Sequence, residues 1–131
     1  MALSVRPIRE FMTRGVQTVE MAASLRDALT TMRQSGVRHL PVLDEGTLVG
    51  VVSQRDLEIL EAHRLLRPGH ATVADAMSPG PYTVGLDEPL HAVVRTMAAN
   101  KYGAAVVAEG RTVYGIFTTT DALRLVEHEL A

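Results

Sequence analysis

Apolar residues recur at helical spacing in two stretches of the chain. In each stretch they occupy positions i, i+3, i+4 and i+7, which place them on one face of a helix. They are Leu25, Ala28, Leu29 and Met32 in the first stretch, and Leu90, Val93, Val94 and Met97 in the second. We therefore predict two amphipathic helices, with Ser24 able to cap the first and Pro89 suited to the opening turn of the second.

Runs with strand character flank each predicted helix. The first helix is followed by runs at 39–44 and 47–53, and the second by runs at 104–108 and 112–118. A short turn that contains glycine separates the two runs of each pair, which is typical of an antiparallel hairpin. A shorter run of the same character precedes each helix, and a closing helix is expected after each hairpin.

The two halves of the chain repeat one another at a constant offset of 65 positions. Identical pairs include Met12 and Met77, Val42 and Val107, Gly50 and Gly115, and Asp56 and Asp121. Each half has the order β-α-β-β-α after a short leading helix. We predict two units, 8–66 and 73–127, joined by a linker at 67–72 that contains a Pro-Gly pair.

The predicted fold class is α/β (α+β), because strands and helices alternate within each unit. A right-handed crossover from the first strand to the hairpin leaves both helices on one face of a three-stranded sheet. A unit of this size then has an uncovered sheet face, which two copies can bury against each other. We therefore expect the units to pack sheet to sheet.

Composition narrows the range of functions. The chain has 131 residues, no cysteine, five aromatic residues, and 13 basic against 15 acidic residues. Lack of cysteine excludes disulfides and thiol chemistry and suits a reducing cytoplasm. Near-neutral charge and few aromatic residues argue against nucleic acid as a direct partner. The charged N-terminus and the absence of a long apolar run predict a cytoplasmic protein that is neither exported nor bound in a membrane.

The sequence lacks the familiar signatures of enzymes. It has no G-x-S-x-G elbow, no phosphate-binding loop with a Walker lysine and no G-x-G-x-x-G fingerprint. Its five histidines show no His-Glu-x-x-His or similar spacing, so we expect no zinc site. We predict that the chain catalyses nothing itself.

The strongest candidate for a site is a motif that occurs once in each half. In residues 50–56 and 115–121 a strand leads into Ser53 or Thr118, with Asp56 or Asp121 three positions later. This pattern is a capping box, which stabilises the start of a helix without any ligand. The same groups can also bind a ligand, since helix N–H groups and hydroxyls receive phosphate and a carboxylate accepts ribose hydroxyls. Both roles can coexist at one site.

Paired units that end in Gly-h-h-[Ser/Thr]-x-x-Asp, where h is apolar, resemble the CBS-domain pair, or Bateman module. Thr-Val before each helix and Arg-His-Leu-Pro-Val in the first unit strengthen the likeness, which covers residues 8–126. The resemblance implies a pseudo-twofold pair of units with two clefts between them. Such clefts commonly hold AMP, ADP, ATP or S-adenosylmethionine as a regulatory ligand.

The resemblance also implies roles for individual residues. Asp56 and Asp121 would hold ribose hydroxyls, while Ser53 and Thr118 would reach toward phosphate. The adenine pockets would be lined by Thr18, Val19, Thr83 and Val84. The other wall would be formed by Val37, Arg38, His39, Leu40 and Pro41, with Tyr102, Gly103, Ala104, Ala105 and Val106 as their counterparts.

The two motifs differ in charge. Around the first are Arg38, His39 and Arg55, which can bind phosphate by charge-assisted hydrogen bonds. The matching residues of the second motif are Gly103, Ala104 and Thr120, although either Lys101 or Arg111 is a cation able to compensate. We predict that the first motif is the better nucleotide site and that the second is weaker, empty or suited to a less charged adenosine compound.

Simpler interpretations of these cations stay open. Arg38 and Arg55 also fit solvated surface charges, and His39 also fits a hydrogen-bonded histidine of a sheet.

At the level of the whole chain we expect a stand-alone regulatory pair without an effector domain. It would act on an unknown partner protein or through self-association, and a homodimer is the expected assembly. The alternative is an interaction or dimerisation module that keeps the fold but has lost its ligand.

Overall fold

The computed structural model describes residues 2–66 and 71–131, which form two compact units. We call the first the terminal unit, because it combines Met1–Val16 with Tyr82–Ala131. The second, the central unit, is Gln17–Pro81. Most of the predicted linker, residues 67–70, lies outside the described residues.

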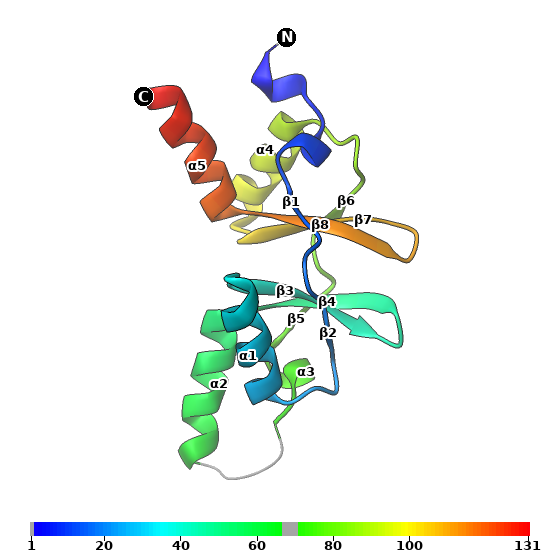
Figure 1. Cartoon of the computed structure of the whole chain (residues 1–131), viewed down its shortest axis with the longest axis vertical. Coiled ribbons are helices and arrows are strands. Elements are labelled where there is room, and N and C mark those ends of the chain that lie inside the picture. Colours follow the sequence, from blue (N-terminus) through cyan, green and yellow to red (C-terminus); the bar gives the residue numbers. More distant parts are fainter. Residues whose placement is uncertain (1, 67–70) are drawn as a thin grey trace. The chain divides into compact units, whose positions relative to one another are not determined.

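The central unit has a four-stranded sheet in the order β2-β3-β4-β5. Its strands are β2 (Val19–Glu20), β3 (His39–Asp44), β4 (Thr47–Ser53) and β5 (Ser78–Pro79), and its helices are α1 (Leu25–Ser35), α2 (Gln54–Leu66) and α3 (Val73–Ala76). β2 runs parallel to β3, and the other neighbours are antiparallel. Figure 1 shows α1 and α2 on the same face of this sheet.

The terminal unit repeats this plan with the strand order β1-β8-β7-β6. Its strands are β1 (Thr13–Arg14), β6 (Thr83–Val84), β7 (Ala104–Glu109) and β8 (Thr112–Thr118). Its helices are the 3-10 turns η1 (Leu3–Val5) and η2 (Ile8–Glu10) and the α-helices α4 (Leu90–Asn100) and α5 (Thr119–Leu130). As in the central unit, both long helices cover one face of the sheet (Figure 1). The predicted fold class and the β-α-β-β-α order of both repeats are thereby confirmed.

Local signals in the sequence explain where these elements begin and turn. Ser24 caps α1, because its Oγ accepts a hydrogen bond from the Asp27 backbone N–H at 3.0 Å. Pro89 is the N-cap residue of α4, one position before the helix begins, rather than part of its opening turn. In the hairpin between β3 and β4, Glu45 and Gly46 both have positive φ, as a type I′ turn requires.

Each unit has a hydrophobic core of its own. In the central unit the core is formed by Val19, Leu25, Ala28, Met32, Leu40, Val42, Val52, Leu57 and Val73. In the terminal unit it is formed by Ile8, Val84, Leu90, Val93, Met97, Ala105, Val107 and Phe117. Three of the four residues predicted to form the apolar face of each helix are buried, which confirms the helical assignments. Leu29 is only half-buried and Val94 is exposed.

The prediction of three strands in each sheet is wrong, because the segment that leads into one repeat adds a fourth strand to the sheet of the other. β1 pairs with β8 and β5 with β4, each through only two residues. Two matched glycines make room for the close approach of the added strands. A Cβ on Gly115 would lie 2.4 Å from the backbone oxygen of Thr13, and one on Gly50 would lie 2.9 Å from that of Ser78. The compact units therefore have different bounds from the repeats of the sequence.

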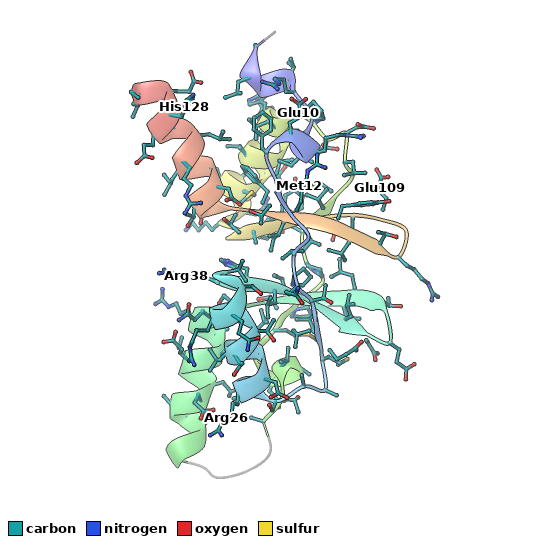
Figure 2. All side chains as sticks on the ribbon, viewed as in Figure 1. Glu10, Met12, Arg26, Arg38, Glu109 and His128 are labelled. Carbon is teal, nitrogen blue, oxygen red and sulfur yellow. The ribbon has the colours of Figure 1, made fainter. Side chains whose placement is uncertain are left out.

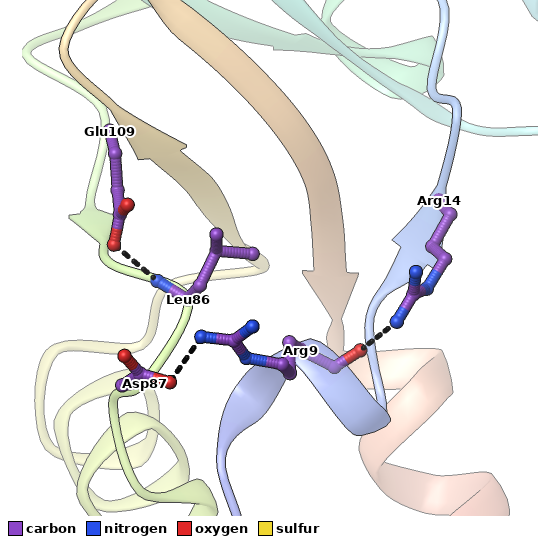
Figure 3. A network of polar contacts seen from close by, with 5 residues as sticks. All are labelled: Arg9, Arg14, Leu86, Asp87 and Glu109. Atoms are coloured by element: carbon purple, nitrogen blue, oxygen red, sulfur yellow. Dashed lines mark hydrogen bonds and ion pairs between the residues drawn. The ribbon is translucent and has the colours of Figure 1, made fainter.

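Polar contacts hold the leading segment of the chain on the terminal unit. The Ile8 N–H donates to the oxygen of Glu88 at 2.8 Å, and the Leu90 N–H donates to the oxygen of Arg6 at 2.9 Å. Arg9 forms an ion pair with Asp87, although the two residues are far apart in the sequence (Figure 3). These contacts anchor residues 6–9 beside the start of α4.

Candidate functional site

In the central unit, the predicted motif forms a corner at which β4 ends and α2 begins. Ser53, the last residue of β4, lies opposite His39, the first residue of β3. The N–H of Gln54, the first residue of α2, donates to the backbone oxygen of Arg38 at 2.8 Å. The ends of two strands and the start of a helix therefore meet here (Figure 2). We call this place the central corner.

The terminal unit contains a matching corner, which we call the terminal corner. Thr118 lies opposite Ala104 in the sheet, and the N–H of Thr119 donates to the oxygen of Gly103 at 3.0 Å. The backbone arrangement is thus the same at both corners.

The capping box predicted for the motif is present at both corners. The Asp56 N–H donates to Ser53 Oγ at 3.0 Å, and the Asp121 N–H donates to Thr118 Oγ1 at 3.2 Å. In return each aspartate accepts through Oδ2, at 3.4 Å from the Ser53 N–H and 2.9 Å from the Thr118 N–H. Both aspartates are half-buried, and Oδ1 of each accepts no hydrogen bond from the described residues. One carboxylate oxygen at each corner therefore remains able to accept from a ligand.

The two capping hydroxyls differ in whether they donate a hydrogen bond. Thr118 Oγ1 lies 3.1 Å from Asp121 Oδ2 and donates its proton to that oxygen. Within the described residues, Ser53 Oγ accepts a hydrogen bond and donates none. Ser53 can therefore donate to a ligand without losing a contact of its own.

A cavity of about 650 Å³ opens at the central corner. It is lined by Arg38, His39, Ser53, Gln54, Arg55, Glu58, Ile59 and Ala62. The structure thus brings together four predicted site residues, namely Arg38, His39, Ser53 and Arg55. Arg38 and Arg55 are exposed, and neither guanidinium pairs with a described acidic residue. Two cations and one hydroxyl donor therefore face an open cavity at the start of a helix.

Asp56 lines a different, adjacent cavity of about 300 Å³. Ile59 borders both cavities, so they lie next to each other along α2. In the adjacent cavity Asp56 is accompanied by His63 and Asp75. Across the described residues, no group of three or more potential ligands is arranged to hold a metal ion.

The remaining predicted residues of the central unit lie in and beside the sheet. Val19 and Leu40 are buried in the core, and Pro41 is buried in β3. Thr18 is half-buried directly before β2. Val37 lines a cavity of about 240 Å³ that shares Arg38 and Gln54 with the 650 Å³ cavity.

The terminal corner has a cavity with different walls. Its volume is about 410 Å³, and it is lined by Val94, Met97, Ala98, Lys101, Tyr102, Gly103, Thr119, Ala122, Leu123 and Val126. Within the described part of the chain, Lys101 is the only charged residue that lines it. This cavity is therefore mainly apolar.

Of the predicted residues of the terminal unit, Tyr102 and Gly103 line this cavity, whereas Thr118, Thr120 and Asp121 do not. The Tyr102 ring lies against that of Tyr82, with 5.4 Å between the centroids. The other predicted residues lie in the strands, where Val84, Ala104, Ala105 and Val106 are buried and Thr83 is exposed.

The cavity of the central corner also contains residues that the sequence analysis missed. Gln54, Glu58, Ile59 and Ala62 follow one another at helical spacing on α2 and form one side of the cavity. Helical periodicity starting from Arg55 would have found Glu58, Ile59 and Ala62, because residues three, four and seven positions apart share a helix face.

Comparison with known protein families identifies the family of this chain. The family model described as CBS domain matches residues 8–65 and again residues 73–128. The chain belongs to the CBS-domain family. It is a tandem CBS pair, as the repeated motif predicted.

The relatives of this CBS pair include short and long proteins. The uncharacterised protein YlbB of Bacillus subtilis (strain 168) is 30% identical over 116 residues, which cover 87% of this chain and 78% of YlbB. Other curated relatives are much longer, and this chain matches only about a quarter of their length.

Two solved structures share its fold over nearly the whole chain. CBSX2 of Arabidopsis thaliana, solved in complex with AMP, is 28% identical with a TM-score of 0.77, over 96% of this chain and 99% of that one. The CBS pair of protein MJ0100, solved with 5′-methylthioadenosine and S-adenosyl-L-methionine, is 24% identical with a TM-score of 0.81, over 95% and 98%.

Within the described residues, no helix of this CBS pair combines the length and apolar character needed to cross a bilayer.

Proposed function

We propose that this CBS pair is a regulatory module that binds an adenosine compound, and that the cavity of the central corner receives its phosphate. One observation carries the proposal: two guanidinium groups without acidic partners among the described residues, Arg38 and Arg55, line the same cavity as the hydroxyl of Ser53. Charge-assisted hydrogen bonds of this kind are among the strongest that proteins make to phosphate. The AMP complex of the 28% identical CBSX2 supports an adenine nucleotide as the ligand class.

The start of α2 adds to the attraction for an anion. The first N–H groups of a helix lack partners within the helix, and the helix dipole is positive at that end. Asp56 already uses Oδ2 to cap this end, which leaves Oδ1 for a ribose hydroxyl. Thr18, Val19 and the segment Val37 to Pro41 remain the proposed surroundings of the adenine.

At the terminal corner we propose weaker binding of phosphate. Gly103 and Thr120 stand where the central corner has Arg38 and Arg55, and the Thr118 hydroxyl proton is held by Asp121. The mainly apolar cavity with Lys101 at its wall suits a less charged adenosine compound, such as S-adenosylmethionine. Tyr102 and Gly103 are the proposed contacts in this cavity. The family resemblance alone supports the other proposed contacts, which lie outside it: Thr83, Val84, Ala104, Ala105, Thr118, Thr120 and Asp121.

We further propose that the module passes its ligand state to a partner protein or to a second copy of itself, in the cytoplasm and without catalysis. An apolar stripe on α5 favours a homodimer. Leu123, Val126 and Leu130 are spaced along one face of the helix and are 67%, 52% and 81% exposed. Arg124 and Glu127 flank this stripe, so an antiparallel second copy of α5 would bring opposite charges together. The same stripe would serve the alternative function, an interaction module without a ligand.

Calorimetric titration with AMP, ADP, ATP and S-adenosylmethionine tests the ligand class and the stoichiometry together. We expect saturable binding of at least one phosphorylated compound, and a ligand at 100 times its Kd should stabilise the fold by about 2.7 kcal/mol. The Arg26→Ala variant is a suitable control, since Arg26 is an exposed arginine of α1 that lines none of the cavities described above. If none of the four compounds binds, the chain is an interaction module and the proposed function is wrong.

A further inference from the structure

Besides its two cations, the cavity of the central corner contains an acidic residue. Glu58 lines this cavity together with Arg38 and Arg55. It is exposed, and its carboxylate pairs with no described residue, including the two arginines. The capping of α2 does not use it, because Ser53 and Asp56 form the cap. Glu58 therefore adds an uncompensated negative charge to a site suited to anions.

The position of Glu58 along α2 determines which part of a ligand would meet this charge. An α-helix rises about 1.5 Å per residue, so Glu58 lies about 6 Å along the axis from Gln54 at the corner. A first phosphate at the corner can contact Ser53 and the start of the helix. A chain of further phosphates would extend into the remaining cavity, whose wall along α2 continues through Glu58, Ile59 and Ala62.

The matched repeat shows that the fold does not require this carboxylate. At the corresponding position of α5, 65 residues later, the chain has Leu123. Both helices form in the same place after the same capping motif. An acidic residue is thus particular to the corner that holds the cations.

We propose that Glu58 is a specificity-determining residue that limits the negative charge of the nucleotide accepted at the central corner, and so favours AMP over ATP. This proposal rests on the proposed function. A phosphomonoester carries a charge of about −1.5 to −2 at pH 7, and each further phosphate adds about one more negative charge. Arg38 and Arg55 can neutralise a single phosphate, whereas the additional charges of ATP are repelled by Glu58.

The test compares the Kd values of AMP and ATP for the parent protein and for Glu58→Gln. Titrations are done with a chelator present, so that no divalent cation masks the charge of ATP. We expect the parent to bind AMP more tightly than ATP. The substitution should strengthen ATP binding by about three- to tenfold and AMP binding by clearly less. Glu58→Lys should shift the ratio of the two Kd values further in the same direction.

A matched control removes the same charge elsewhere. Glu129 is an exposed glutamate of α5 that lines none of the cavities described above, and Glu129→Gln should leave the ratio of the two Kd values unchanged. Thermal unfolding of each variant checks that the fold is intact. A ratio that Glu58→Gln moves by less than twofold, or a parent that prefers ATP, overturns this inference while leaving nucleotide binding in place. If the parent binds neither nucleotide, this inference fails, and the four-compound titration decides separately whether the proposed function fails as well.

Discussion

The central and terminal corners have the same backbone and different chemistry. Each joins two strand ends to a capped helix through the same hydrogen bonds. The cavities at the two corners have different side chains at three matched positions. The central cavity has Arg38, Gln54 and Glu58. The terminal cavity has Gly103, Thr119 and Leu123 at the same places. The duplicated motif therefore fixes the shape of a corner, while a few side chains decide what it can bind.

The cavities themselves can be matched in the same way. The 240 Å³ cavity of the central unit is lined by Leu29, Met32, Arg33, Gly36, Val37, Arg38 and Gln54. The residues 65 positions later, Val94, Met97, Ala98, Lys101, Tyr102, Gly103 and Thr119, all line the 410 Å³ cavity of the terminal unit. The terminal cavity is larger, and three further residues of α5, namely Ala122, Leu123 and Val126, also line it. One groove has thus been kept in both repeats, with a wider form in the terminal unit.

The two closing helices also differ at a matched position that packs against the core. Leu57 of α2 is fully buried in the central core, whereas the matched residue of α5, Ala122, is only half-buried. No residue of α5 is buried among the described residues. Because a shorter side chain buries less apolar surface, we expect Ala122 to anchor α5 less firmly than Leu57 anchors α2.

Leu57→Ala, which gives the central unit the residue of the terminal unit, should have the largest effect on stability. Removal of a buried leucine side chain typically costs 2–5 kcal/mol, so we expect a loss of about that size in the free energy of unfolding. Chemical denaturation measures it. The control Leu123→Ala changes a leucine that is 67% exposed and should cost less than about 0.5 kcal/mol. Equal losses in the two variants would show that the closing helices are anchored alike.

Arg55→Thr, which gives the central corner the residue found at position 120, should have the largest effect on binding. Loss of a hydrogen bond to a charged group costs about 1.5–3 kcal/mol, so the Kd for AMP should rise by about one to two orders of magnitude. Calorimetry measures it, with Arg26→Ala as the control. An unchanged Kd would place the phosphate away from this corner.

Leu123→Glu tests whether the exposed apolar stripe of α5 mediates self-association. A charge in the middle of the exposed apolar stripe should weaken self-association by about tenfold or more, because the carboxylate loses its hydration in the interface. Light scattering coupled to size exclusion measures the mass as a function of concentration. Glu129→Gln, near the C-terminal end of α5, serves as the control. A parent protein that is monomeric at every concentration would contradict the proposed dimer.

Ser53→Ala and Thr118→Ala compare the two capping hydroxyls, and their effects should be the smallest. Each should lower stability by about 1 kcal/mol, since each removes an N-cap side chain. Only Ser53→Ala should also weaken AMP binding, by about three- to tenfold, because only the Ser53 proton is available to a ligand. Parallel thermal unfolding and calorimetry separate the two effects. Equal losses of affinity would mean that the hydroxyls have the same role.

Much of the fold could be predicted because its signals are local and occur twice. The helix faces around Leu25 and Leu90, the hairpins and the capped corners follow from spacing and turn residues alone. The fourth strand of each sheet escaped prediction, since two residues such as Thr13 and Arg14 are too short for an alternating pattern. The sequence contains one sign of the fourth strand, the matched pair Gly50 and Gly115. These glycines make room for a segment that is distant in the sequence, so their role is visible only in the folded chain.

The candidate site could be predicted only in part. The motif indicated the corner and its cations, which the structure places around one cavity. That Asp56 borders a neighbouring cavity instead depends on its side-chain direction, which no spacing rule supplies. The size of the cavity beside α5 depends on how closely this helix packs on the rest of its unit, and residue spacing in the sequence does not supply that.

Backbone amide NMR spectra recorded during titration with AMP test the location of the nucleotide site most directly. We predict that the largest saturable shifts occur at residues 53–58 and at Arg38, with much smaller ones at residues 118–123. Largest shifts at the terminal corner, or none at either corner, would contradict the claim that the cationic central corner binds the nucleotide.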